Sequence, residues 1–326
     1  MRAYHLTIDA KGPQLSLRDT PEPVPQANEL LVKVAASSLN RGEFIRGSRV
    51  TPVNSNDAAK PCGMEAAGVV TGVGPGVTDF AVGTRVMGRA KAGFADFTTI
   101  DAREAIRVPD SLSWDDAGAI PIVFLVSYDM VVAGGHLTAG EWLLVTGASS
   151  GVGVASVQIA KALGAQTIGT SGSAAKLDSL RAAGLDHGIA TRGPDFAAKV
   201  RELTAKHGAD LVINNVGGTV FAECVRAMAY MGRFATVGYL DRTMQAEIDI
   251  EALHTQRLHL FGVSNKLRTA AQRAQTVAGF TRDILPLIVA GKIKPVVDRV
   301  YPFADLPSAV ERMRADSQVG KIVIRW

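Results

Sequence analysis

The chain of 326 residues is about twice the usual length of a domain, so two globular units are expected. Hydrophobic residues make up 47% of the sequence and charged residues 20%, which excludes a disordered or fibrous protein. The formal net charge of +4 comes without any run of Lys and Arg, and this argues against nucleic acid or a membrane as partner. A small-molecule ligand fits this composition better.

The cysteine content and the hydropathy of the sequence indicate the cellular location of the protein. Its two cysteines, Cys62 and Cys224, exclude a disulfide framework and favour a reducing, cytoplasmic location. The N-terminus alternates like a strand and has no apolar core of a signal peptide. The longest apolar stretch, 117–132, is interrupted by Pro121 and Asp129, so it predicts a buried helix and not a membrane span.

The first part of the chain, up to about residue 120, shows short β-like runs separated by Gly and Pro. Examples are 30–34, 68–70 and 85–87, and their spacing predicts a mostly antiparallel, barrel-like unit. At the other end of the sequence, a terminal strand at 320–324 is expected to return to this first unit.

The rhythm changes after residue 142, where buried strands alternate with amphipathic helices. This alternation is typical of a parallel, doubly wound sheet that binds a nucleotide. Strands are predicted at 142–145, 166–169, 209–213 and 233–237, and helices at 152–163, 174–183, 195–206, 218–230 and 269–290.

A glycine-rich turn joins the strand 143–145 to the helix that follows it. The turn reads Thr146-Gly-Ala-Ser-Ser-Gly-Val-Gly153, in the order strand, turn, helix that a dinucleotide fold requires. Glycines without a Cβ let backbone amides approach a pyrophosphate, and the helix N-terminus adds free N–H groups and partial positive charge. The residues expected at the pyrophosphate are Ser150, Gly151, Val152 and Gly153.

The end of the next strand predicts which nicotinamide cofactor binds. An NAD site places Asp or Glu about 20 residues past the turn, and the stretch 168–176 has no carboxylate. Hydroxyls, helix-terminal amides and an ammonium hold a 2′-phosphate instead, so NADPH is favoured. In the alternative interpretation, Ser173 only caps the next helix and Lys176 is a surface charge. The residues expected at the phosphorylated ribose are Thr170, Ser171, Gly172, Ser173 and Lys176.

Over nearly its whole length the sequence resembles the zinc-free quinone oxidoreductase and zeta-crystallin-like branch of the medium-chain dehydrogenase/reductase superfamily. The resemblance implies an α/β protein with a GroES-like, β-rich catalytic domain at 1–120 and 266–326. It also implies a Rossmann domain with a doubly wound parallel sheet at 121–265, and a homodimer formed through that domain. The segments that carry it are 35–40, 63–70, 72–77, 82–86, 148–153, 170–176, 215–218, 232–233 and Gly238.

The resemblance also implies site residues. Asn40 is expected beside the nicotinamide ribose or the substrate, although an Asn there can simply cap a turn. Tyr239 is expected at the nicotinamide or substrate, with a buried aromatic and a bonded hydroxyl as the alternative. The family pattern has a Tyr where this chain has Phe44 and a Thr where it has Val126. The further cofactor residues that the resemblance implies are Asn215, Val216, Gly238, Tyr239, Val263 and Asn265.

Two positions depart from the zinc-dependent relatives. Asn40 and Met64 stand where those enzymes carry zinc ligands, and the stretch 88–101 lacks the cysteines of a structural zinc lobe. No metal is therefore expected. Without a Lewis acid, reduction of a quinone or an α,β-unsaturated carbonyl is favoured, because the developing charge is delocalised.

Three other functions stay open at this point. They are a zinc-free alcohol or carbonyl reductase, a non-enzymatic NADPH-binding protein, and a short-chain dehydrogenase. The last is disfavoured because about 140 residues precede the glycine turn and neither Tyr230 nor Tyr239 has a Lys four residues on. The segment 47–61, expected to line the substrate pocket, carries no residues that identify the substrate.

Overall fold

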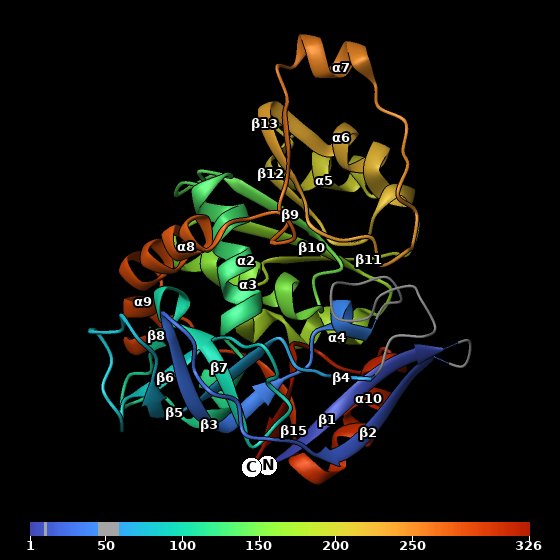
Figure 1. Ribbon diagram of the computed structural model, residues 1–326. Coiled ribbons are helices and arrows are strands. Elements are labelled where there is room, and N and C mark those ends of the chain that lie inside the picture. Colours follow the sequence, from blue (N-terminus) through green and yellow to red (C-terminus); the bar gives the residue numbers. More distant parts are fainter. Residues whose placement is uncertain (10–11, 45–58) are drawn as a thin grey trace. The chain divides into compact units, whose positions relative to one another are not determined.

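The computed structural model describes most of the chain (Figure 1). The described ranges are 1–9, 12–44 and 59–326. Most of the predicted substrate segment, residues 47–58, lies outside the described residues. Within them, no helix combines the length and the apolar composition needed to cross a bilayer.

Two compact units make up the chain, each with its own core. The segments are 1–122, 268–281 and 295–326 in unit 1, and 123–267 and 282–294 in unit 2. The predicted boundaries differ mainly near the C-terminus, because the prediction gave all of 266–326 to the first domain. The helical segment 282–294 groups with unit 2 instead.

Unit 1 is built on two mostly antiparallel sheets. The larger sheet follows the order β15-β16-β3-β5-β6-β8, with β7 paired to β3, and the smaller follows β2-β1-β4. The strands are β1 (Arg2–Asp9), β2 (Gly12–Asp19), β3 (Glu29–Ser38), β4 (Lys60–Pro61), β5 (Glu65–Val73), β6 (Arg85–Arg89), β7 (Phe97–Asp101), β8 (Ile106–Arg107), β15 (Val297–Pro302) and β16 (Lys321–Arg325).

The predicted terminal strand is confirmed as β16. It lies between β15, to which it is parallel, and β3, to which it is antiparallel with Val323 opposite Ser38. Its Ile322 and Ile324 side chains join a core with Tyr4 and Phe94. The last strand of the sequence therefore completes the sheet that the first strands begin.

Helices in unit 1 are short apart from α8 and α10. Helix α10 presents Leu306, Ala309, Val310 and Met313 to the core at helical spacing. The helical elements are η1 (Arg41–Phe44), η2 (Ala102–Glu104), α1 (Trp114–Gly118), most of α8 (Ala270–Asp283), η6 (Phe303–Asp305) and α10 (Leu306–Arg314).

The prediction of a single helix at 269–290 is wrong. Helix α8 ends at Asp283, and a separate helix, α9 (Leu285–Val289), follows. Pro286 lies in the first turn of α9, where its missing N–H costs nothing, whereas inside a continuous helix it would remove a hydrogen bond. The predicted helix at 117–132 is divided in the same way, since Pro121 begins α2 (Pro121–Tyr128) and a π-helical turn, η3 (Asp129–Ala133), follows.

Unit 2 is the predicted parallel sheet with helices. The strand order is β11-β10-β9-β12-β13-β14, and all neighbours are parallel. The strands are β9 (Trp142–Thr146), β10 (Gln166–Ser171), β11 (His187–Ala190), β12 (Ala209–Asn214), β13 (Met228–Thr236) and β14 (His259–Gly262). The helices beyond α2, η3 and α9 are α3 (Gly151–Ala162), α4 (Ala174–Ser179), η4 (Arg181–Ala183), α5 (Ala197–Leu203), η5 (Gly218–Val220), α6 (Phe221–Ala227) and α7 (Ile250–Thr255).

The core of unit 2 explains this alternation. Leu144, Val212 and Phe234 from three strands pack with Phe196 and Val225 from the segments around α5 and α6. Figure 1 shows α5 and α6 together beside β12 and β13. Burying an apolar strand face under an amphipathic helix is the main stabilising contribution in such a layer. The sheet is therefore the packed core of unit 2, and its strand ends can carry a site.

Candidate functional site

The glycine turn has the geometry that a dinucleotide site needs. Strand β9 ends at Thr146, the turn follows, and α3 begins at Gly151. Ser150 is the N-cap of α3, and its hydroxyl accepts the amide of Gly153 at 3.0 Å. A Cβ at Gly153 would lie 2.7 Å from the carbonyl oxygens of Gly147 and Ala148. Only glycine allows α3 to begin this close to the strand.

Two amides of this turn are available to an anion. The first amides of a helix have no acceptor within the helix, and Ser150 satisfies only that of Gly153. The amides of Gly151 and Val152 therefore remain at the positive end of the α3 dipole. The four residues predicted at the pyrophosphate are the N-cap and the first turn of α3, an arrangement that fits a diphosphate group.

The residues predicted to bind the phosphorylated ribose of the cofactor lie at the end of the next strand, β10. Thr170 and Ser171 are buried, and the hydroxyl of Ser171 accepts the amide of Ser173 at 3.3 Å. Ser173 is the N-cap of α4, with its hydroxyl accepting the amide of Lys176 at 3.4 Å. Capping of α4, the alternative role considered for Ser173, is thus present in the structure. An N-cap hydroxyl keeps its proton as a donor for a phosphate.

Sequence reasoning missed one cation at this place, Arg192. Its side chain lies over Gly172, so that a Cβ at Gly172 would come within 2.5 Å of the Arg192 Nε. Arg192 is exposed, and among the residues that the structure describes no hydrogen bond or ion pair engages its guanidinium. Gly172 therefore leaves room for an unpaired guanidinium above the loop that is predicted to hold the 2′-phosphate.

The other predicted cofactor residues follow the remaining strands of the same sheet. Asn215, after β12, donates its side-chain amide to the Thr146 carbonyl at 2.9 Å, which ties the ends of β12 and β9 together. A Cβ at Gly238, after β13, would lie 3.2 Å from the Asn215 carbonyl oxygen. The amide of Val263, after β14, donates to the Thr236 carbonyl at 2.9 Å.

These strand ends share one edge of the sheet. Because parallel strands point the same way, their carboxyl ends meet, and ligands of such sheets bind where the strand order reverses. Here the chain runs outward from β9 through β10 to β11 and then returns to β12 beside β9. The residues that the structure gathers on this edge, in addition to the glycine turn, are 170–173, Arg192, Asn215, Val216, Gly238, Tyr239, Val263 and Asn265.

Tyr239 is exposed to 54%, so the alternative of a buried aromatic with a bonded hydroxyl does not describe it. Its backbone carbonyl accepts the Arg242 amide at 2.9 Å, which fixes the turn that carries it. Among the described residues no hydrogen bond engages its hydroxyl. This side chain is therefore available at the carboxyl edge of the sheet.

Asn40 belongs to unit 1, where it lies in a buried polar cluster. Glu65, the first residue of β5, is fully buried, and its Oε1 accepts from Ser38 Oγ at 2.6 Å and from Asn40 Nδ2 at 2.7 Å. Its Oε2 accepts the Ile122 amide at 2.7 Å. Lys321 of β16 is 5% exposed and reaches Glu65 Oε1 at 2.9 Å. We call Asn40, Glu43, Glu65 and Lys321 the Asn40 cluster.

The Asn40 cluster does not fit a zinc ion. Asn40 offers an amide whose Oδ1 accepts from Lys321 Nζ at 2.8 Å, so a cation already lies against the one atom able to ligate. Met64, at the second ligand position of the zinc enzymes, offers only a thioether. Among the residues that the structure describes, no three His, Cys, Asp or Glu side chains are grouped to hold a metal. No step through zinc follows from these residues.

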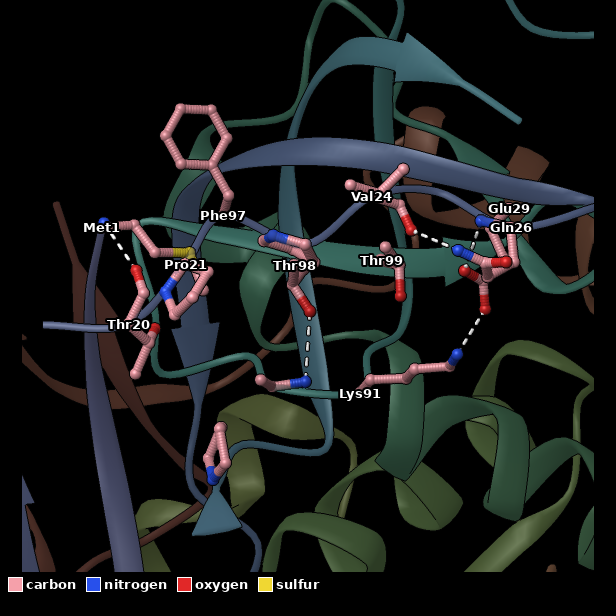
Figure 2. A pocket seen from close by; sticks show the side chains of 13 residues that line it. Met1, Thr20, Pro21, Val24, Gln26, Glu29, Lys91, Phe97, Thr98 and Thr99 are labelled. Carbon is pink, nitrogen blue, oxygen red and sulfur yellow. Dashed lines mark hydrogen bonds and ion pairs between the residues drawn. The ribbon is translucent and has the colours of Figure 1, made fainter. Parts of the chain in front are cut away.

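A separate hollow of about 260 Å³ lies in unit 1 and is shown in Figure 2. Two charged side chains that line it, those of Glu29 and Lys91, form an ion pair at 2.5 Å. Pro21, Val24 and Phe97 are among the other residues that line the hollow. None of the predicted site residues lines this hollow, so it is not the candidate active site.

Comparison with known proteins identifies both halves of the chain. Residues 26–110 match the alcohol dehydrogenase GroES-like domain, and residues 151–277 match the zinc-binding dehydrogenase domain. The GroES-like match excludes a short-chain dehydrogenase, which has no such domain before its glycine turn. The chain is therefore an oxidoreductase of the medium-chain dehydrogenase/reductase superfamily. Within it, the chain falls in the quinone oxidoreductase branch that lacks the zinc ligands.

Individual relatives agree with this assignment. The structure of mycobacterial Rv1454c complexed with NADPH matches with a TM-score of 0.87 and 28% identity, covering 100% of both chains. A mycobacterial quinone oxidoreductase matches with a TM-score of 0.85 and 27% identity, also over 100% of both chains. The polyketide synthase GfsB of Streptomyces halstedii is 33% identical over 89% of this chain, which spans only 5% of that synthase.

Proposed function

We propose that this protein is an NADPH-dependent reductase that transfers hydride to a quinone or an α,β-unsaturated carbonyl without a metal. The observation that carries the proposal is the carboxyl edge of the unit 2 sheet. A diphosphate fits the amides of Gly151 and Val152. The stretch 168–176, which is predicted to lie at the adenosine ribose, contains no carboxylate. The mycobacterial relative that was solved with NADPH supports the same cofactor.

The residues on this edge divide the work of holding NADPH. The turn 150–153 binds the pyrophosphate, while Thr170, Ser171, Ser173, Lys176 and Arg192 hold the 2′-phosphate with hydroxyls and cations. The nicotinamide end is bounded by the residues after the central strands. These are Asn215, Val216, Gly238, Tyr239, Val263 and Asn265. When bound, NADPH supplies a hydride from C4 of its nicotinamide.

The substrate class follows from the residues at the two positions where zinc-dependent relatives ligate their metal. A saturated ketone or aldehyde concentrates the developing charge on one alkoxide oxygen, which a Lewis acid normally stabilises, and Asn40 and Met64 do not fit a metal ion. A quinone or enone spreads the charge over a phenolate or enolate, which a few hydrogen bonds stabilise. The Tyr239 hydroxyl, which no hydrogen bond engages among the described residues, is available for this task. Asn40 contacts the nicotinamide ribose or the substrate in the proposal.

A substrate panel tests the proposal. We expect the purified protein to oxidise NADPH, followed by its absorbance, with quinones and enones, and to leave saturated aldehydes and ketones unreduced. Faster turnover of saturated carbonyls or alcohols would favour a zinc-free alcohol or carbonyl reductase. Tight NADPH binding without turnover on the whole panel would favour a non-enzymatic NADPH-binding protein.

Replacing Arg192 by alanine tests the phosphate site directly. We expect the affinity for 2′,5′-ADP, measured by calorimetry, to fall about 10–100-fold, because one charge-assisted hydrogen bond to phosphate is worth about 1.5–3 kcal/mol. The affinity for 5′-AMP should stay within about twofold, since it lacks the 2′-phosphate. Lys176→Ala should show the same selectivity. Equal losses for both nucleotides would show that these side chains support the loop and do not bind the phosphate.

Assembly and location complete the proposal. We propose a homodimer formed through unit 2, in which β14 is an edge strand among the described residues and offers that edge for pairing. Sedimentation equilibrium measures the mass of the assembly. A cytoplasmic location agrees with two free, buried cysteines. Burial raises the pKa of the Cys62 and Cys224 thiols, so both stay protonated and unreactive. A monomer at micromolar concentration would contradict the dimer.

A further inference from the structure

The Asn40 cluster contains one carboxyl group whose hydrogen bonds are incomplete. Glu43 lies in the short η1 turn and is fully buried. Its Oε1 accepts from Asn40 Nδ2 at 3.2 Å, a long hydrogen bond. Among the residues that the structure describes, no donor makes a hydrogen bond to its Oε2, and the Met64 amide interacts only weakly with this carboxyl group. A buried carboxylate with so few donors would be costly if it were ionised.

The ammonium of Lys321, which lies near Glu43, donates its hydrogen bonds to other groups. Lys321 Nζ has three protons, and they go to the Leu39 carbonyl at 2.7 Å, to Asn40 Oδ1 at 2.8 Å and to Glu65 Oε1 at 2.9 Å. Glu65 takes four hydrogen bonds, as an ionised carboxylate does. The lysine is thus paired with Glu65, and within the described part of the chain Glu43 has no ion pair.

Five groups face Glu43 from the elements around it. Glu65 on β5 repels its negative charge, while Lys321 on β16 and the hydrogen bond from Asn40 favour it. The Cys62 thiol is buried nearby and uncharged. Burial is the strongest effect and raises the pKa of Glu43 to about 8, although the Met64 amide offsets a small part of this rise. Glu43 is accordingly a neutral carboxylic acid at neutral pH.

The same hydrogen bonds determine what Asn40 can offer a ligand. Both of its N–H groups are used, one by Glu65 and one by Glu43. Its Oδ1 must face Lys321, because an ammonium only donates, and this fixes the orientation of the amide. One lone pair of Oδ1 remains. Asn40 is therefore able to accept a hydrogen bond from a hydroxyl group, but has no proton left for a developing oxyanion.

We propose that Glu43 is the positioning residue of Asn40. As a neutral acid it holds the second N–H of the Asn40 amide, so that Oδ1 stays available to a hydroxyl group such as that of a ribose. Its ionisation adds a second negative charge to the cluster, draws the Asn40 amide and Lys321 towards Glu43, and removes that acceptor. The inference rests on the proposed function, in which Asn40 contacts the nicotinamide ribose or the substrate.

Two substitutions separate positioning from packing. Glu43→Leu removes the acceptor for Asn40, and we expect kcat/KM to fall about tenfold at every pH, the value of one hydrogen bond. Glu43→Gln keeps a neutral acceptor and should restore kcat/KM to within about threefold of wild type at pH 7. Wild-type kcat/KM should fall above about pH 8, by about tenfold per pH unit, and the fall should be absent in Glu43→Gln.

A matched control is Glu223→Gln, which alters another buried glutamate. Glu223 lies in unit 2 and is paired with Arg226 at 2.7 Å, so its replacement should leave the alkaline fall in place. The inference is overturned if Glu43→Gln shows the wild-type alkaline fall. It is also overturned if Glu43→Gln is as impaired at pH 7 as Glu43→Leu, because a charged Glu43 would then be the working form.

A spectroscopic measurement decides the protonation state without any turnover. A neutral carboxylic acid has an infrared carbonyl stretch distinct from that of a carboxylate. We expect the wild-type band to disappear as the pH rises through about 8, and to be missing in Glu43→Gln at every pH. If no substrate is reduced, the proposed function fails, but the inference about Glu43 can still be tested. The infrared band and the pH dependence of NADPH affinity, both measured in wild type and in Glu43→Gln, provide that test. A band missing from wild type at pH 7, or the same pH dependence of affinity in both proteins, overturns the inference.

Discussion

Replacing Lys321 by methionine will lower the free energy of unfolding of unit 1 by about 3–5 kcal/mol, the usual cost of removing one partner from a buried ion pair. Lys321 is 5% exposed and Glu65 is fully buried, so water cannot solvate the carboxylate that is left behind. The substitution also removes the donors that hold the Leu39 carbonyl and Asn40 Oδ1. Methionine matches the length of the lysine stem, so the loss reports charge more than volume.

Denaturant unfolding in a Trp142→Phe background measures this effect in unit 1 alone. The remaining tryptophans, Trp114 and Trp326, both belong to that unit, so their fluorescence reports its unfolding. The double variant Glu65→Gln with Lys321→Met removes both charges and should recover roughly half of the loss. A loss below about 1 kcal/mol for Lys321→Met, or no recovery in the double variant, would contradict a buried ion pair.

The sequence predicts best what depends on neighbouring residues. The turn from Thr146 to Gly153 needs only a strand, a short glycine segment and a helix in order, and the structure has all three. The cofactor preference predicted at the end of β10 is also local, because the absence of Asp and Glu from 168–176 is read directly from the sequence. The terminal strand β16 is also predicted from its local pattern.

Contacts between distant residues escape this reasoning. Lys321 meets Glu65 only because β16 pairs with β3 and β3 with β5, a register that no local pattern states. A lysine and a glutamate that each begin a largely buried strand are a signal that these two charges need a partner. Arg192 is missed for a different reason. Arg192 follows β11, which is four residues long and only half-buried. Because β11 has no apolar run, its sequence does not mark it as a strand, and nothing in the sequence points to the residues after it as part of the site.

Stability against pH gives the second large effect, because Glu43 binds its proton more tightly in the folded chain. Burial raises the pKa of Glu43 from 4.5 to about 8. Below about pH 4.5 the group is protonated in both states and its contribution is fully present. Between about 4.5 and 8 only the folded state keeps the proton, so stability falls as the pH rises, and above 8 the loss is complete.

Comparing wild type with Glu43→Gln isolates this contribution from every other titrating group. At pH 4.5 the two proteins should have similar free energies of unfolding, since both carry a neutral group at position 43. By pH 8.5 the variant should be more stable by on the order of 3–5 kcal/mol, because the carboxyl of unfolded wild type is then ionised and must either take up a proton or be buried with its charge on folding. The tryptophan signal in the Trp142→Phe background again restricts the measurement to unit 1. A difference that does not change with pH would mean that the buried carboxyl is ionised at all of these pH values, and that Lys321 serves both glutamates at once.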